Sequence, residues 1–260
     1  MRGILADTVS EMVDRKMVWV YSGVALLGLL AILVTRSVEM QFQTEGLNMQ
    51  AMNELWSPRL WLYNKFMYYM VFLSVLVTAG LIPNMLSKGR VDFYLSKPLS
   101  RRQHLLTKMA AVWMVYGGLM VLIMILVGSV GAWAFGAVDT GLGYIVLSNL
   151  LAFFIWLVVT TFAGVWSSSA PMSILAVFLM WILQQILSWH DAFSELIDSP
   201  FWGKLVDVFY YVVPKTIEIS EATLRLAGGN PVDWMPFYTS VAFALVLMYV
   251  TVFMFNRKDY

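Results

Sequence analysis

The sequence predicts an all-α membrane protein in which residues 1–260 form one domain with six transmembrane helices. Of its 260 residues, 60% are hydrophobic and only 13% are Asp, Glu, Lys or Arg, whereas soluble domains carry about 25% charged residues. A water-soluble fold of this composition could not cover its surface with polar groups. The apolar residues also gather into long runs without the alternation that is typical of strands in a membrane barrel.

Each of the six apolar runs is long enough to cross a bilayer as one helix. About 20 residues span the hydrocarbon core, with a range near 17–25, and a continuous helix satisfies its own backbone hydrogen bonds in lipid. The predicted spans cover residues 17–34, 60–82, 109–135, 142–166, 172–188 and 234–255. The leader before the first span holds three acids, and no small-residue cleavage site follows that span, so we expect a retained helix and not a signal peptide.

The basic residues of the loops predict that both termini lie in the cytoplasm, because Lys and Arg concentrate on that side of a membrane protein. With this orientation, 11 of the 17 Lys and Arg residues lie inside and six lie outside. We therefore expect a multi-pass protein of the inner (cytoplasmic) membrane with lipid around it. The net charge of +1 gives no indication of a nucleic-acid partner.

The N-terminal leader predicts a short amphipathic helix on the cytoplasmic side. Its apolar residues recur at i, i+4, i+7 and i+8, and they are Leu5, Val9, Met12 and Val13. This spacing places them on one helix face, which would lie on the inner leaflet or against a soluble partner as an interface helix. The plainer alternative is a simple anchor before the first span.

The loop between the second and third spans, residues 83–108, is basic and also holds an apolar segment. It carries six Lys and Arg residues against one acid, Asp92, and a role in setting topology would explain this charge. Such a role does not explain the apolar residues beside Asp92, nor Pro98, which breaks the segment into two short helices. Ser100 and Gln103 have the spacing of a capping box at the start of the second helix. A loop of this kind is expected to press against another surface.

The same loop carries a motif with a family resemblance. Residues 89–108 read G-R-V-D-F-Y-L-S-K-P-L-S-R-R-Q-H-L-L-T-K. The stretch resembles the cytoplasmic loop of ABC-2 type permeases, the membrane subunits of type V ABC exporters, whose pattern runs roughly G-T-L-E-x-L-L-S-x-P-V-S-R-x-x-x-L-x-G-K. The residues that match in position or type are Gly89, Asp92, Leu95, Ser96, Pro98, Ser100, Arg101, Leu105 and Lys108. The chain is similar to the permeases of nitrous-oxide-reductase maturation and to related ABC-2 exporters.

The resemblance implies that this loop is a coupling helix, which sits in a cleft of a separate ATPase subunit and transmits the motion of ATP binding to the spans. The contacting residues would be Val91, Asp92, Tyr94, Leu95, Pro98, Arg101 and Arg102. The turn at Ser168 and Ser169 would make a second, smaller contact, for which a plain tight turn is at least as good an interpretation. The family also implies a dimer with a second copy or a paralogous permease. ATP and Mg would bind to the partner ATPase, with no cofactor in this chain.

The outer segment between the fifth and sixth spans, residues 189–233, predicts two short amphipathic helices at the outer surface. Apolar residues recur at helical spacing up to Pro214, which ends the first helix, and the second helix covers residues 216–227. In the resembled family such helices help to close the outer mouth, and the alternative is a passive surface hairpin.

Polar residues within the spans, such as Ser74 and Gln184, either line a path or bond between helices, and bonding is favoured.

Several classes of catalytic and metal site find no support in the sequence. No Walker-type G-x-x-x-x-G-K-[ST] occurs, so the chain lacks the loop that cradles ATP phosphates. There is no cysteine, which excludes a thiolate nucleophile or a Cys-ligated metal. The two histidines, His104 and His190, are expected in loops on opposite sides of the membrane. Outer-loop methionines can bind Cu(I), but adaptable apolar filler is the favoured interpretation, so no catalytic or metal residue is predicted.

The function predicted from these features is that of a permease subunit without enzymatic activity of its own. Separate ATPase subunits would hydrolyse ATP, and this chain would couple the hydrolysis to outward transport or to mechanical work across the membrane. The alternative is a non-transporting membrane scaffold or assembly factor for another complex. The cargo is not predicted.

Overall fold

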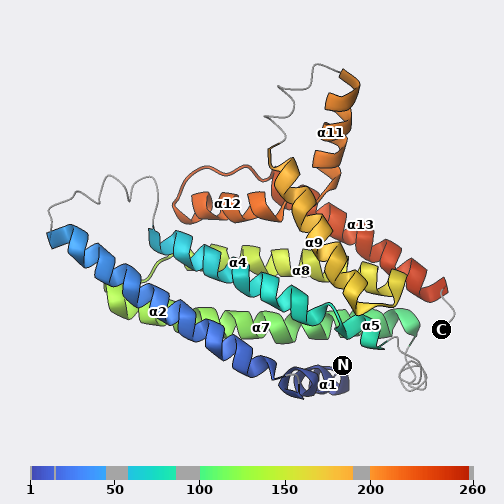
Figure 1. Cartoon of the computed structure of the whole chain (residues 1–260), viewed down its shortest axis with the longest axis horizontal. Coiled ribbons are helices and arrows are strands. Elements are labelled where there is room, and N and C mark those ends of the chain that lie inside the picture. The colour runs from blue at the N-terminus through green and yellow to red at the C-terminus, as the bar shows by residue number, and fades with distance from the viewer. Residues whose placement is uncertain (1, 15, 45–57, 86–99, 190–199, 258–260) are drawn as a thin grey trace.

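The structure, a computed structural model, describes residues 2–14, 16–44, 58–85, 100–189 and 200–257. These ranges hold helices, turns and short connections, with no strand among them, so the predicted all-α class is confirmed for this part of the chain. Six of the helices are long and apolar enough to cross a membrane. The structure therefore suggests a multi-pass membrane protein, as the sequence predicted (Figure 1).

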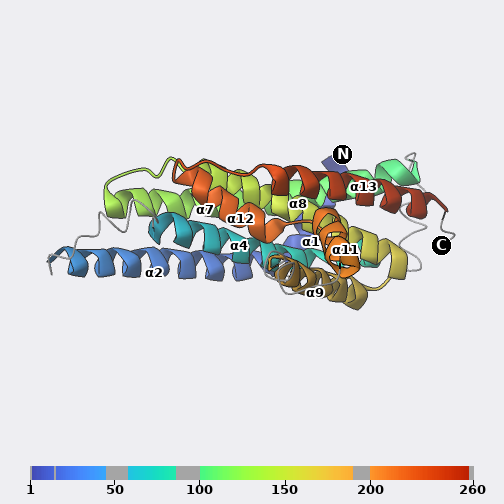
Figure 2. The same ribbon diagram turned by 90° about the horizontal axis from the view of Figure 1, so that it is seen from above.

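The long helices form a bundle around α8. They are α2 (Met17–Thr44), α4 (Pro58–Thr78), α7 (Arg101–Phe135), α8 (Leu142–Ser167), α9 (Ala170–Leu187) and α13 (Met235–Arg257). The shorter helices are α1 (Arg2–Asp14), α5 (Leu81–Met85), α11 (Pro200–Val212) and α12 (Thr216–Ala227). Helix α8 contacts α4, α7, α9, α12 and α13. Figure 2 shows α2 and α9 on one side of the bundle and α13 on the other, with α8 between them.

Close packing and polar contacts hold the long helices together, because lipid tails are as apolar as the side chains and give no hydrophobic driving force between helices. Tyr21, Tyr116 and Phe153 are fully buried where α2, α7 and α8 meet. The Tyr21 hydroxyl on α2 forms a hydrogen bond with the Ser74 hydroxyl on α4. Ser74 thus bonds between helices, which was the favoured interpretation of the polar residues in the spans.

Three helix boundaries differ from the predicted spans. The second span ends at Thr78 and not at residue 82, because Pro83 has no N–H to donate to the carbonyl of residue 79, and the chain restarts as α5. The predicted short helix after Pro98 is not separate from the third span. It is the first part of α7, since no Gly or Pro interrupts residues 101–116. The first span continues as α2 to Thr44.

The two short outer helices take different positions. Helix α11 projects from the bundle in Figure 1 and is seen nearly end-on in Figure 2, and it contacts α13 and α9. Helix α12 covers the predicted range and packs against α8, α4, α13 and α9, while Glu221 and Arg225 stay exposed. Its last residue, Ala227, lies so close to Gly141 that a Cβ at position 141 would be 2.6 Å from the Ala227 Cβ. The predicted range of the second short helix is confirmed, and its place at the outer surface of the membrane stays a prediction.

Candidate functional site

The predicted coupling loop lies mainly outside the described residues. Five of its predicted contact residues fall within 86–99, which the structure does not describe, and they are Val91, Asp92, Tyr94, Leu95 and Pro98. The remaining two, Arg101 and Arg102, lie in the first turn of α7, where Arg102 is exposed and Arg101 is partly buried. Both arginines therefore stand at the point where the loop enters a long helix.

A capping box fixes the start of α7. The Gln103 backbone N–H donates to the Ser100 hydroxyl oxygen at 3.3 Å, and the Ser100 backbone N–H donates to the Gln103 side-chain oxygen at 3.1 Å. These bonds satisfy two N–H groups that lack intrahelical partners at a helix start. The predicted cap is confirmed, and it gives the end of the loop a fixed direction.

Lys108, the last residue of the motif, joins α7 to the N-terminal helix. Its side chain is only 2% exposed, and its ammonium lies 3.1 Å from the Asp7 carboxylate and 3.3 Å from that of Glu11. The ammonium also donates to the Thr8 hydroxyl at 3.3 Å. Asp7 and Glu11 share one face of α1 because they are four residues apart. We call Asp7, Thr8, Glu11 and Lys108 the Lys108 clamp, a role that the sequence interpretation missed.

The apolar residues predicted to form an interface on the N-terminal helix are only partly covered, and their contact with the inner leaflet or a partner stays a prediction. Ile4 and Met12 are buried together with Thr8 on a helix that packs against α7 and α2. Of the predicted interface residues, Met12 is buried and Leu5 is partly buried, whereas Val9 is 43% and Val13 is 54% exposed. The polar contacts with Lys108 therefore determine which face of α1 packs against α7. Val9 and Val13 face away from the described part of the protein.

The predicted second contact forms a tight turn between α8 and α9. Ser168 has a left-handed backbone, with φ of 53°, and its N–H donates to the Gly164 carbonyl at 2.8 Å. Ser169 is extended and directly precedes α9, which has Pro171 in its first turn. The turn supports the plainer interpretation of this segment. A contact of Ser168 and Ser169 with a partner stays a prediction.

A layer of uncharged polar side chains holds α12 inside the bundle. The Asn64 amide on α4 donates to the Ser220 backbone carbonyl at 3.0 Å and to the Ser220 hydroxyl at 2.8 Å. The Asn149 amide on α8 donates to the Asn64 side-chain oxygen at 3.3 Å. At the other end of α12, the Thr216 hydroxyl donates to the Gln184 side-chain oxygen on α9 at 2.6 Å. Three of these contacts connect α12 directly with α4 and α9, and the fourth links α8 to Asn64 on α4.

A buried lysine stabilises the turn between α11 and α12. Lys215 is 4% exposed, and its ammonium donates to the Tyr210 backbone carbonyl and lies 4.3 Å from the centre of the Tyr210 ring. The Lys215 backbone N–H donates to the Ser240 hydroxyl on α13 at 2.7 Å. Burial lowers the pKa of the Lys215 ammonium, and the nearby Glu218 carboxylate opposes this shift.

His104 does not lie in a loop, as the sequence suggested. It belongs to α7, because that helix begins at Arg101, and its side chain is 3% exposed. Within the described ranges, no group of three or more His, Asp or Glu residues comes together in a way that could hold a metal ion.

No protein-family model matches the chain, and no curated protein matches it.

Proposed function

We propose that this chain is the membrane permease subunit of an ABC-2 type exporter. It couples ATP hydrolysis on separate ATPase subunits to outward transport or to mechanical work across the membrane. The observation that carries the proposal is the stiff connection behind the coupling motif. The capping box fixes the start of α7, and the Lys108 clamp joins that start to α1 two turns later.

This connection is the mechanical element that a coupling loop needs. Helix α7 has 35 residues, which at 1.5 Å per residue give a length of about 50 Å. A push on the loop at Arg101 therefore displaces the whole of α7 and not only its first turn. Because α1 is bound to α7 and packs on α2, the same push displaces the first span as well. A loop that only set topology would need none of these contacts.

The proposal includes partners with stated roles. Arg101 and Arg102 would make charge-assisted contacts at the rim of the ATPase cleft, around an apolar anchor formed by Val91, Tyr94 and Leu95. One six-span chain supplies half of a pathway in the resembled family, so a second copy or a paralogous permease completes it. Both termini would lie in the cytoplasm of a cell whose inner membrane holds the complex.

Affinity purification from native membranes tests the proposal. We expect an ATPase to co-purify in stoichiometric amounts and the double variant Tyr94→Asp with Leu95→Asp to lower its recovery about tenfold or more, because two anchor residues are lost. The matched control is Val138→Asp. Val138 is 74% exposed in the connection between α7 and α8, at the far end of α7 from the motif.

Two results contradict the proposal. If the double variant retains the ATPase as well as the control does, the loop is not the docking element. If a stable complex purifies without any ATPase, the chain is a scaffold or assembly factor and not a permease. Membrane insertion of each variant is measured in parallel, so that loss of the protein is not mistaken for loss of docking.

A further inference from the structure

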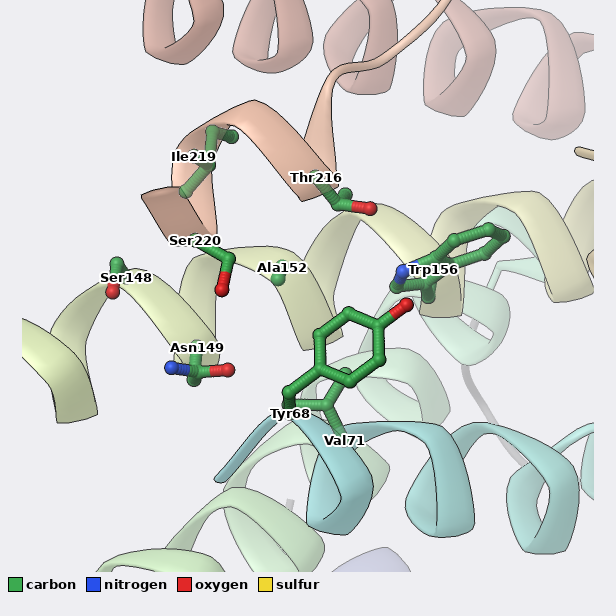
Figure 3. Close-up of a pocket in the computed structure, with 9 residues that line it drawn as sticks. All are labelled: Tyr68, Val71, Ser148, Asn149, Ala152, Trp156, Thr216, Ile219 and Ser220. Carbon is green, nitrogen blue, oxygen red and sulfur yellow. The ribbon is translucent and has the colours of Figure 1, made fainter. Parts of the chain in front are cut away.

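A small space with polar walls lies where α4, α8 and α12 meet (Figure 3). It has room for about one water molecule, and we call it the polar space. Side chains with hydrogen-bonding groups line it from all three helices, and they are Tyr68, Ser148, Asn149, Trp156, Thr216 and Ser220. A space of this size inside a bundle can be filled by water only if its walls supply two to four hydrogen-bond partners.

Two buried groups of α8 at the polar space have unused hydrogen-bonding capacity within the described residues. Asn149 is 4% exposed, and its amide nitrogen donates to the Ile145 carbonyl at 2.8 Å and to the Asn64 side-chain oxygen at 3.3 Å. Both partners accept, which fixes the orientation of the amide and leaves its oxygen without a donor in this part of the chain. Trp156 is 6% exposed, and its indole N–H has no acceptor among the described residues.

Two hydroxyl groups at the same space keep a hydrogen to donate. The Ser220 oxygen accepts from the Asn64 amide at 2.8 Å, and the Tyr68 oxygen accepts from the Trp181 indole at 2.8 Å. Neither hydroxyl donates to an acceptor in the described ranges. The hydroxyl of Thr216 differs, since it already donates to the Gln184 side-chain oxygen at 2.6 Å. The polar space therefore offers three donors and one acceptor.

These groups surround the space without bonding to one another. In Figure 3 the Tyr68 hydroxyl is directed toward the Trp156 indole nitrogen, and the Ser220 hydroxyl is directed toward the Asn149 amide. Within the described part of the chain, no hydrogen bond joins any two of these four residues. A buried polar group without a partner is unfavourable. One water molecule corrects this arrangement, because its oxygen accepts from two donors while one of its hydrogens reaches the Asn149 oxygen.

A second space of similar size lies next to the first and has a different chemistry. Tyr68, Val71 and Trp156 line both spaces, and each has room for about one water molecule. The second space is completed by Phe72, Val75, Val177 and Trp181 from α4 and α9. The Trp181 N–H is already bonded to Tyr68, and the other three side chains are apolar. Apolar cavities stay dry, so we expect the two neighbouring spaces to differ in hydration.

We propose that the polar space is a binding site for one water molecule. The water accepts hydrogen bonds from the Trp156 indole and the Ser220 hydroxyl and donates to the Asn149 side-chain oxygen. It thereby links α12 with α8. The direct hydrogen bonds of Ser220 and Thr216 attach α12 to α4 and α9, and the water adds the third long helix on which α12 packs. The site does not depend on an ATPase partner.

Solid-state NMR of the full-length chain in lipid bilayers tests the site, with the tryptophan indoles labelled with ¹⁵N. Magnetisation is transferred from water protons to the indole N–H groups, and Trp156→Phe assigns the Trp156 signal. We expect a cross-peak between water and the Trp156 indole. The matched control is Trp113, whose indole donates to the Leu150 carbonyl at 3.1 Å and does not line the polar space. We expect no such cross-peak for Trp113.

Two variants distinguish the wet space from the dry one. Ala152 lines the polar space, so Ala152→Val should expel the water, abolish the Trp156 cross-peak and raise the equilibrium constant for unfolding about tenfold, because polar groups lose their partner. Val177 lines only the second space, and Val177→Ile should leave the cross-peak unchanged. If Ala152→Val does not fold, the spectrum of the unmodified chain decides the result.

Three results would overturn the proposal: no transfer from water to Trp156 in the unmodified chain, equal transfer to Trp156 and Trp113, or a Trp156 cross-peak that persists in folded Ala152→Val. Loss of the cross-peak in Val177→Ile as well would place the water in the second space and would also contradict the assignment.

Discussion

The ammonium of Lys108 lies 3.1 Å from the carboxylate of Asp7, although 101 residues separate them in the chain. This contact brings the N-terminal helix against the start of α7, close to the capped end of the proposed coupling loop. The two sides of the clamp differ in exposure. Lys108 is 2% exposed, whereas Asp7 is 45% and Glu11 is 22% exposed.

This difference in exposure predicts that removing Lys108 and removing the two carboxylates lower the free energy of unfolding by unequal amounts. In Lys108→Met the remaining carboxylates reach water, so we expect the free energy of unfolding to fall by about 1 kcal/mol or less. In the double variant Asp7→Asn with Glu11→Gln the buried ammonium loses both counter-ions, and we expect a loss of about 3 kcal/mol. Reversible unfolding in mixed micelles measures both values.

The control for the clamp is Arg102→Met, because Arg102 is exposed in the first turn of α7. It should change the unfolding free energy by less than about 0.5 kcal/mol. Equal losses for Lys108→Met and for the double variant would mean that the clamp is not buried as described.

The capping box predicts that its loss changes hydrogen exchange only near the start of α7. Ser100→Ala removes the acceptor for the Gln103 N–H, and loss of such a cap costs about 1 kcal/mol. We expect faster hydrogen exchange in residues 101–104, with little change beyond Lys108 because the clamp holds the helix there. Ser129→Ala serves as the control, since the Ser129 hydroxyl is exposed and, among the described residues, bonds only the Ile125 carbonyl of its own helix. Unchanged exchange in Ser100→Ala would contradict the role of the cap.

Lys215 predicts a pH dependence of stability with a defined sign. Burial lowers the pKa of its ammonium in the folded protein below the ordinary value of 10.5. Between the two pKa values the unfolded state binds more protons, so the unfolding free energy rises as the pH increases through this window up to 10.5. In Lys215→Met this rise should be absent. Lys204→Met, which changes an exposed lysine of α11, should retain it, and a rise that persists in Lys215→Met would refute the assignment.

The sequence predicts the six spans because each contains a long apolar run, and length alone identifies a helix that can cross lipid. It predicts helix ends well where local chemistry determines them, as at Ser100 with Gln103 and at the start of α12 after Pro214. It fails at Thr78, where Pro83 ends the helix several residues before the apolar run is finished.

The contacts between distant segments could not be predicted in the same way. Asp7 and Glu11 look like the solvated face of an amphipathic helix, since nothing nearby in the sequence shows that Lys108 is their partner. Asn64 and Asn149 are single polar residues in apolar runs, and their meeting with Ser220 depends on how α12 enters the bundle. The spacing of residues along one helix shows which of them share a face, but it does not identify the segment that packs against that face.

The Asn64 contacts predict that this residue holds α12 in place. Asn64→Leu keeps the size of the side chain but removes three hydrogen bonds, two to Ser220 and one from Asn149. Bonds of this kind within membranes contribute about 0.6 kcal/mol each, so we expect a loss of about 2 kcal/mol in unfolding free energy. Ser22→Ala is the control, because the Ser22 hydroxyl is exposed and its one bond within the described ranges is to the Val18 carbonyl of its own helix. A loss no larger than that of the control would mean that packing alone positions α12.

The close approach of Gly141 and Ala227 predicts that a destabilising substitution at position 141 is partly compensated by a smaller residue at position 227. Gly141→Ala would place a Cβ 2.6 Å from the Ala227 Cβ and 3.0 Å from the Ala227 carbonyl oxygen, so one of the two backbones must shift. Overpacking of this kind costs about 1–3 kcal/mol. Adding Ala227→Gly removes the nearer contact but keeps the carbonyl contact, and we therefore expect the double variant to recover part of the lost stability. Purely additive losses in the double-variant cycle would show that α12 does not end against the start of α8, and the described path of α12 through the bundle would then be wrong.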